Sequence, residues 1–82
     1  RGISMNFTVY STKWCGPCQR LKRDLRDAGI DFEEVDIELV PDAAKLVEKV
    51  NNGNQTVPTL IFSDGTAMTN PSLASVRAHL GV

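Results

Sequence analysis

The two cysteines of this chain stand only three positions apart, in Cys15-Gly16-Pro17-Cys18. A disulfide between them would close almost no loop, so it would constrain the unfolded chain very little. Small domains have little stability to spare, and many rely on several disulfides or on a structural metal. With 82 residues, of which 41% are hydrophobic, this chain must be stabilised by packed helices and a sheet instead. The cysteine pair is therefore available for chemistry.

Charge and hydropathy exclude several classes of function. The net charge of −1 gives no global signal for nucleic-acid binding. No apolar run approaches the roughly 20 residues that a membrane-spanning helix needs, and the N-terminus shows no signal-peptide pattern. We therefore expect a cytoplasmic monomer without nucleic-acid or membrane partners. Residues 1–4 precede Met5 and are expected to be a non-native or disordered extension, and residues 5–82 are expected to form one domain.

Hydrophobic periodicity predicts elements in the order β-α-β-α-β-β-α. The expected strands cover residues 7–10, about 31–37, 57–62 and 67–69, and the expected helices cover about 15–28, 41–50 and 70–80. The first β-α-β unit should give parallel strands, and a turn at residues 63–66 should add an antiparallel hairpin. This α/β arrangement is a four-stranded mixed sheet with helices on both faces.

Helical spacing also predicts which side chains enter the core. Leu21, Leu25 and Ala28 form the expected buried face of the first helix, and Gly29 is expected just beyond its end. The last helix is expected to bury Leu73, Val76 and Leu80. The basic residues of the first helix should pair with the acidic residues around the second strand.

The position of the cysteines at a helix start predicts their roles. Cys15 and Cys18 lie on one side of the first turn, with Gly16-Pro17 setting the bend between them. Unpaired N–H groups and the helix dipole favour an anion at Cys15, and Lys13 adds positive potential. Cys18 should be less exposed and less acidic. We therefore expect Cys15 to attack a disulfide, after which either Cys18 or a small thiol releases it.

Two other interpretations of the cysteine pair remain open. A Cys-x-x-Cys pair is also half of a zinc site, and His79 is the other plausible soft ligand in the chain. A zinc or redox-sensing module would then require two chains. The pair could also be a purely structural disulfide, although its short loop disfavours this.

The residues around the cysteines resemble two related families. Trp14-Cys15-Gly16-Pro17-Cys18 is similar to the thioredoxin active-site sequence, whereas Thr56-Val57-Pro58 before the third strand resembles a glutaredoxin. Thioredoxins carry a buried acid six residues before the first cysteine, and this chain has Val9 there. The resemblance implies a thioredoxin fold of the glutaredoxin type and a thiol–disulfide oxidoreductase.

Within that group the chain most resembles the mycoredoxins, glutaredoxin-like proteins of actinobacteria. The similar stretches are residues 12–16, 35–38, 50–59, 64–65 and 69–72. The resemblance implies that the co-substrate is mycothiol, a sugar-linked cysteine thiol. It also implies that no cofactor is tightly bound. The implied substrates are protein disulfides or mycothiol–protein mixed disulfides. Electrons would come from mycothiol, which is kept reduced by its own reductase, and the exchange would usually use the first cysteine alone.

Two departures bear on the substrate and the electron source. Glutathione-binding glutaredoxins carry a Gly-Gly and acidic pattern before the last helix, where this chain has Thr69-Asn70-Pro71-Ser72 without an acid. Gly16-Pro17 replaces the Pro-Tyr or Gly-Tyr of many glutaredoxins, which leaves open a dithiol donor reduced by thioredoxin reductase. The redoxins of ribonucleotide reductase are a further alternative, but their usual C-terminal Ser-Gly-Phe-Arg-Pro stretch is absent.

The resemblance also implies a substrate-binding surface. Pro58 should be cis, so that the backbone of Val57, after Thr56, faces an extended substrate. We expect Trp14 to form one wall of the groove. Around the start of the last helix, Asn70 and Ser72 are expected to cap the helix first and, with Thr69, to contact the bound thiol second.

Overall fold

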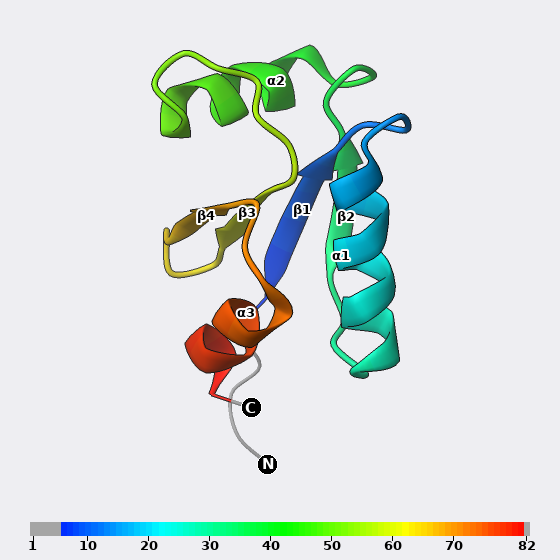
Figure 1. The fold of residues 1–82 in the computed structure, drawn as a ribbon. Helices are drawn as coiled ribbons and strands as arrows, with labels where there is room; N and C mark the ends of the chain where they lie inside the picture. The colour runs from blue at the N-terminus through cyan, green and yellow to red at the C-terminus, as the bar shows by residue number, and fades with distance from the viewer. Residues whose placement is uncertain (1–5, 82) are drawn as a thin grey trace.

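A computed structural model describes residues 6–81 of the chain (Figure 1). The extension expected at residues 1–4 lies outside this range. The elements follow the predicted order β-α-β-α-β-β-α: β1 (Phe7–Ser11), α1 (Gly16–Asp27), β2 (Glu33–Asp36), α2 (Pro41–Val50), β3 (Thr59–Phe62), β4 (Ala67–Thr69) and α3 (Leu73–Leu80). Between residues 6 and 81, no helix is long and apolar enough to cross a membrane.

The strands form the predicted mixed sheet, and their order in it is β2-β1-β3-β4. β1 runs parallel to β2 and antiparallel to β3, and β4 completes the hairpin with β3. Tyr10, near the carboxyl end of β1, pairs with Val35 on one side and with Thr59 on the other. The loops after β1 and β2 and the segment before β3 therefore meet at the same end of the sheet (Figure 1).

Alternating side chains of β1 divide the core between the two faces of the sheet. On one face, α1 and α3 cover the larger cluster, formed by Phe7, Val9, Leu21, Leu25, Leu60, Phe62 and Val76. On the other face, α2 contributes Ala43 and Val47 to a smaller cluster with Ile37, against which Tyr10 and Val57 pack. The second cluster lies at the end of the sheet where the loops meet, so α2 supports that end.

The buried face of α1 differs from the predicted one. Ala28 is exposed, because α1 ends at Asp27 and Ala28 is its C-cap. Ile30 packs on the core beyond the helix, with its N–H bonded to the carbonyl of Leu25 at 2.9 Å. In α3, Val76 is fully buried, whereas the other two expected core residues of that helix are half-buried.

Two strands are shorter than predicted. β2 ends at Asp36, because the chain turns there and the N–H of Leu39 bonds to the carbonyl of Asp36 at 3.1 Å. β3 begins at Thr59 and not at residue 57, since Pro58 has no N–H to give to a strand ladder. Both shortened ends lie beside the cysteines, where the chain leaves regular structure.

Candidate active site

Cys15 is the N-cap residue of α1. Its backbone is extended, with φ −82° and ψ 109°, and its Sγ accepts a hydrogen bond from the backbone N–H of Cys18 at 3.2 Å. The two cysteines form a disulfide, with their Cα atoms 5.2 Å apart. Cys15 retains 5% of its surface exposed and Cys18 none, so Cys18 is the less accessible of the two, as expected.

The residues between the cysteines are exposed to solvent. Gly16 is the first residue of α1, and Pro17 follows in the first turn, where its missing N–H costs no hydrogen bond. A partner that approaches this turn therefore meets Pro17 before it meets Cys18.

The segment before β3 faces Cys15. The peptide bond between Val57 and Pro58 is cis, as the family resemblance implied. The carbonyl oxygen of Val57 lies 3.7 Å from Sγ of Cys15. Pro58 is buried, Val57 is half-buried and Thr56 is exposed, so one backbone segment lies beside the sulfur and remains partly open to solvent.

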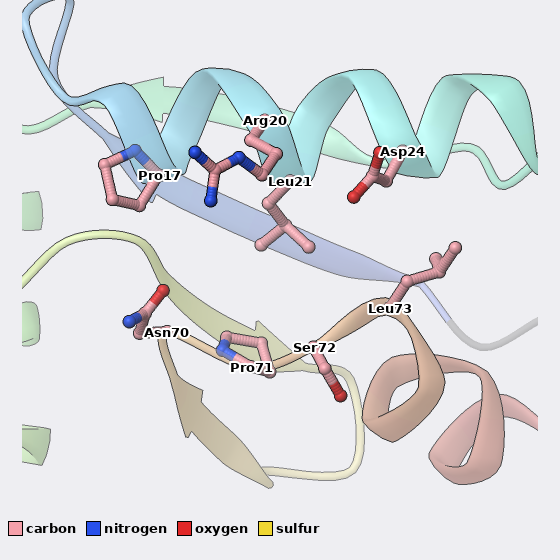
Figure 2. Close-up of a pocket in the computed structure, with 8 residues that line it drawn as sticks. All are labelled: Pro17, Arg20, Leu21, Asp24, Asn70, Pro71, Ser72 and Leu73. Atoms are coloured by element: carbon pink, nitrogen blue, oxygen red, sulfur yellow. The ribbon is translucent and has the colours of Figure 1, made fainter.

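A groove of about 350 Å³ runs from the active-site turn along α1 (Figure 2). Its helical wall carries Pro17, Arg20, Leu21 and Asp24, and its opposite wall is the segment 70–73. Figure 2 shows the side chains of both walls on either side of this space. The groove therefore links the cysteine turn to the start of α3.

The three residues expected around the start of the last helix have different positions. Ser72 is the N-cap of α3, and its Oγ accepts from the N–H of Ser75 at 3.1 Å. The expectation that Asn70 also caps this helix is wrong: it has φ 48° and its N–H bonds to the carbonyl of Pro58 at 2.7 Å. Thr69 donates its hydroxyl proton to Oδ1 of Asn51 at 2.5 Å.

Trp14 lies on the surface beside the cysteines. Its side chain is 72% exposed, and Nε1 donates to Glu38, in the loop after β2, at 3.0 Å. Trp14 is not among the residues that line the groove of Figure 2. Lys13 is also exposed, and its carbonyl accepts from Gln19 at 3.4 Å.

An ion pair between a buried lysine of α1 and an exposed carboxylate of β2 was not predicted as a unit. Lys22, one turn after Cys18 on α1, is 7% exposed at its side chain and pairs with Glu34 of β2. Arg26 lies 3.8 Å from the same carboxylate, and Ser11 donates to it at 3.4 Å. The expected pairing between the first helix and the second strand is thus confirmed for Lys22 and Arg26. The four-residue spacing from Cys18 was the signal that Lys22 shares the buried face.

The proposed zinc ligand His79 lies elsewhere in the fold. Its Nε2 is 3.1 Å from Asp64, and its ring packs on Phe62 with a centroid distance of 4.4 Å. α3 ends at the opposite end of the molecule from the start of α1 (Figure 1). Hydrogen bonds from Thr66 and, to a smaller extent, the proximity of His79 lower the pKa of Asp64. In residues 6–81, no group of three His, Cys, Asp or Glu side chains is placed to hold a metal ion.

This arrangement supports one type of chemistry. A sulfur at a helix start, with a backbone N–H aimed at it, is a site where a thiolate is stabilised and therefore nucleophilic. A second sulfur within bonding distance can displace a partner from the first. The neighbouring backbone and the groove offer contacts to whatever carries the disulfide.

Comparisons with known proteins agree with this geometry. The glutaredoxin family model matches residues 7–67. A Mycobacterium tuberculosis protein described as a glutaredoxin is 50% identical over 78 residues, which cover 95% of this chain and 93% of the relative. Mycoredoxin 1 of Corynebacterium glutamicum is 40% identical over 75 residues, 92% of each chain. The crystal structure of Methanosarcina acetivorans methanoredoxin superposes with a TM-score of 0.81 at 29% identity, covering 94% of this chain and 85% of the other.

These matches span most of the chain and include both the cysteine turn and the sheet that supports it. They also account for the arrangement of three helices around a four-stranded mixed sheet, which is a thioredoxin fold of the glutaredoxin type. The chain belongs to the glutaredoxin family and is a thiol–disulfide oxidoreductase.

Proposed function

We propose that this protein reduces mixed disulfides between mycothiol and proteins, with Cys15 as the nucleophile and Cys18 as the resolving thiol. The observation that carries the proposal is the groove of Figure 2, which begins at Pro17 and ends at the neutral segment Asn70-Pro71-Ser72. The amide of Asn70 is an uncharged hydrogen-bonding group, which suits the hydroxyls of a sugar-linked thiol. The 40% identity to Mycoredoxin 1 supports the same co-substrate.

The reaction begins at Sγ of Cys15. In the reduced protein, the Cys15 thiolate attacks the mycothiol sulfur of the mixed disulfide. The client protein leaves as a thiolate and takes a proton, and Cys15 is now bonded to mycothiol. The Cys18 N–H, which lies 3.2 Å from Sγ of Cys15 in the oxidised state, would stabilise the attacking thiolate.

Two routes can then remove mycothiol from Cys15: the first regenerates the thiol directly, and the second forms a disulfide that an external thiol or reductase must then reduce. In the monothiol route, a second mycothiol attacks the bound mycothiol sulfur, releases Cys15 and leaves as the disulfide of two mycothiols, which an NADPH-dependent reductase returns to the thiol. In the dithiol route, the Cys18 thiolate attacks Sγ of Cys15, releases mycothiol and forms the Cys15–Cys18 disulfide. The bonded cysteines of this structure support the second route.

Val57, Thr56 and Trp14 serve the protein side of the substrate in this proposal. The half-buried Val57 backbone beside Sγ of Cys15 offers hydrogen bonds to an extended chain on either side of its disulfide. Thr56 precedes Val57 in the chain and Trp14 precedes Cys15, and both residues are exposed. Lys13, next to Trp14, adds a positive charge. Thr69 contributes indirectly in this proposal, because its hydroxyl donates its proton to Asn51.

The direct test is a coupled assay. The protein is incubated with a mycothiol-capped client, mycothiol, the mycothiol disulfide reductase and NADPH, and we expect NADPH to be consumed. A parallel reaction with a glutathione-capped client, glutathione and glutathione reductase should be at least about tenfold slower, since the segment before α3 lacks the acidic pattern described above. Equal rates in the two systems would contradict mycothiol specificity.

A second candidate function is a dithiol donor that thioredoxin reductase reduces directly. The exposed Gly16-Pro17 turn and the formed Cys15–Cys18 disulfide favour it, since a protein reductase must reach the disulfide from outside. Incubating the oxidised protein with thioredoxin reductase and NADPH decides this point. A failure of thioredoxin reductase to reduce Cys15–Cys18 would remove this candidate and leave the first unaffected.

A further inference from the structure

Asn51 lies at the centre of a hydrogen-bond network that joins the end of α2 to β3 and β4. It is the C-cap of α2, and its Nδ2 group donates to the carbonyl of Val47 at 2.9 Å and to the hydroxyl of Thr59 at 3.1 Å. Its Oδ1 accepts from the hydroxyl of Thr69 at 2.5 Å. Both amide hydrogens and the amide oxygen of this side chain are therefore used.

The direction of the network is fixed by Thr59. This fully buried hydroxyl has one proton, which it gives to the carbonyl of Thr56 at 2.7 Å. It must then accept from its other neighbour, so the atom of Asn51 that faces it is the nitrogen. The oxygen of Asn51 is left for Thr69, which is the arrangement observed. An aspartate at position 51 could not reproduce this pattern, because a carboxylate has no proton to donate.

Each branch of the network ends at one wall of the site. Through Thr59, Asn51 holds the carbonyl of Thr56, and the next residue is Val57, whose carbonyl lies 3.7 Å from Sγ of Cys15. Through Thr69, it holds the residue before Asn70, which lines the groove of Figure 2. The N–H of Asn70 closes the ring by bonding to the carbonyl of Pro58 at 2.7 Å.

We propose that Asn51 is a positioning residue that fixes the Val57 backbone and Asn70 relative to Cys15, and that it thereby sets the affinity for the disulfide substrate. This inference rests on the proposed roles of Val57 and Asn70 as substrate contacts. Asn51 does not touch the sulfur in this arrangement. The hydrogen bond that stabilises Cys15 comes from Cys18 and from the start of α1, which the network does not include. Asn51 should therefore govern substrate binding and leave the reactivity of Cys15 unchanged.

The test separates binding from reactivity in single-turnover reactions. Reduced protein is mixed with a peptide that contains one internal disulfide, and oxidation of Cys15 and Cys18 is followed by the fluorescence of Trp14, the single tryptophan. The peptide disulfide is reduced to a dithiol as the protein dithiol becomes a disulfide, so the electrons balance. For Asn51→Ala we expect the half-saturating peptide concentration to rise about tenfold and the limiting rate to stay within about twofold. The pH profile of Cys15 alkylation by iodoacetamide should be unchanged.

Asn54→Ala is the matched control. It removes an amide from the same loop, but Asn54 is exposed and bonds to the backbone carbonyl of Asn51 at 3.2 Å, outside the network of side chains. We expect its half-saturating peptide concentration to match the wild type. Thr69→Val provides a second variant should Asn51→Ala fail to fold. It should raise the half-saturating concentration about threefold, because the N–H of Asn70, the residue after Thr69, holds the carbonyl of Pro58 beside Val57.

The outcomes distinguish this inference from the proposed function. An unchanged half-saturating concentration in folded Asn51→Ala, or in Thr69→Val if that is the variant that folds, would overturn the positioning role. So would a changed alkylation profile, since it would place Asn51 in control of the sulfur. The peptide carries no mycothiol, so its reaction does not depend on the co-substrate. Absence of mycothiol-dependent turnover in the coupled assay would overturn the proposed function and leave the result with the peptide standing.

Discussion

The backbone N–H of Cys18 donates to Sγ of Cys15 over 3.2 Å, so Cys15, the proposed nucleophile, is also the N-cap of α1. Serine is also a preferred N-cap residue. Cys15→Ser should therefore lose all detectable thiol exchange but keep an unfolding free energy within about 0.5 kcal/mol of the reduced wild type. Coupled turnover and urea unfolding of the two reduced proteins measure the two effects. A loss of about 2 kcal/mol or more would show that serine does not replace the sulfur as a cap.

Cys18→Ser tests the second cysteine by a different readout. The backbone N–H at position 18 remains, so Cys15 should still attack a mycothiol-capped client, but no neighbouring thiol can then release the product. We expect a Cys15–mycothiol adduct to accumulate at one per chain in intact-mass spectra when free mycothiol is left out. Adding mycothiol should remove the adduct if the monothiol route operates. Cys15→Ser is the control and should form no adduct, and a Cys18→Ser protein that formed none either would contradict the assigned nucleophile.

Local sequence patterns were sufficient to predict much of this fold. The β-branched and aromatic residues 7–10 predicted β1, and the turn residues 63–66 predicted the hairpin; both are present. The i, i+3 spacing of the cysteines at a helix start predicted a bonded pair with Cys18 deeper than Cys15. These features depend on residues close in sequence, where propensity and periodicity carry the information.

The features that the sequence did not reveal depend on contacts between distant segments. Asn51 acts through Thr59 and Thr69, and nothing in the local pattern shows that α2 ends beside both β3 and β4. Lys22 looked like one of several surface charges until β2 placed Glu34 against it. Asn70 resembled a helix cap by type, but the backbone around it turns to pair with Pro58.

The ion pair between Lys22 and Glu34 should respond unequally to removal of its two members. Glu34→Gln leaves the ammonium of Lys22, which is 7% exposed, without its anion. We expect this to lower the free energy of unfolding by about 1–3 kcal/mol. Lys22→Met fills the same space with an apolar chain and leaves a carboxylate that is 39% exposed and can be hydrated, so it should cost less than about 1 kcal/mol. Urea unfolding at pH 7 measures both.

Lys45→Met is the control for this pair, since it removes an exposed lysine from α2 and should change stability by less than about 0.5 kcal/mol. A larger loss in Lys22→Met than in Glu34→Gln would contradict the asymmetry. It would show that the buried lysine stabilises the fold mainly by its charge.

The ionised Asp64 carboxylate should stabilise the folded protein near neutral pH, and this stabilisation should be lost in acid. Hydrogen bonds from Thr66, and to a smaller extent His79, lower its pKa in the folded state. When the pKa of a carboxyl is lower in the folded state than in the unfolded state, its ionised form stabilises the fold at pH values above the unfolded pKa of about 3.9. This stabilisation is lost as the pH falls through the folded pKa. The pKa of the Asp64 carboxyl, followed by NMR, should therefore lie below its ordinary value. Asp64→Asn should lower the melting temperature at pH 6 and have no effect at a pH below the folded pKa.

Thr66→Ala serves as the comparison for Asp64, because it removes the side-chain contribution and keeps the backbone N–H, which donates at 2.9 Å. The Asp64 pKa should then stay below its ordinary value, since the backbone bond is the larger cause. An Asp64 carboxyl that titrates at or above the ordinary value in the wild type would contradict the hydrogen-bonded hairpin.

Trp14 should matter for large substrates and not for small ones. Its ring is 72% exposed beside Cys15 and is tied to Glu38 by the 3.0 Å hydrogen bond from Nε1. Next to Glu38, Leu39 is also largely exposed, so an apolar surface borders the cysteines on this side. Exposed aromatic anchors often dominate protein interfaces, so Trp14→Ala should lower kcat/KM for a protein disulfide about tenfold. Its rate with hydroxyethyl disulfide, which is too small to reach this surface, should stay within about twofold. Trp14→Phe keeps an apolar ring and loses the Nε1–H, and it should recover most of the activity on the protein disulfide. An equal loss on both substrates would show instead that Trp14 acts on the sulfur of Cys15.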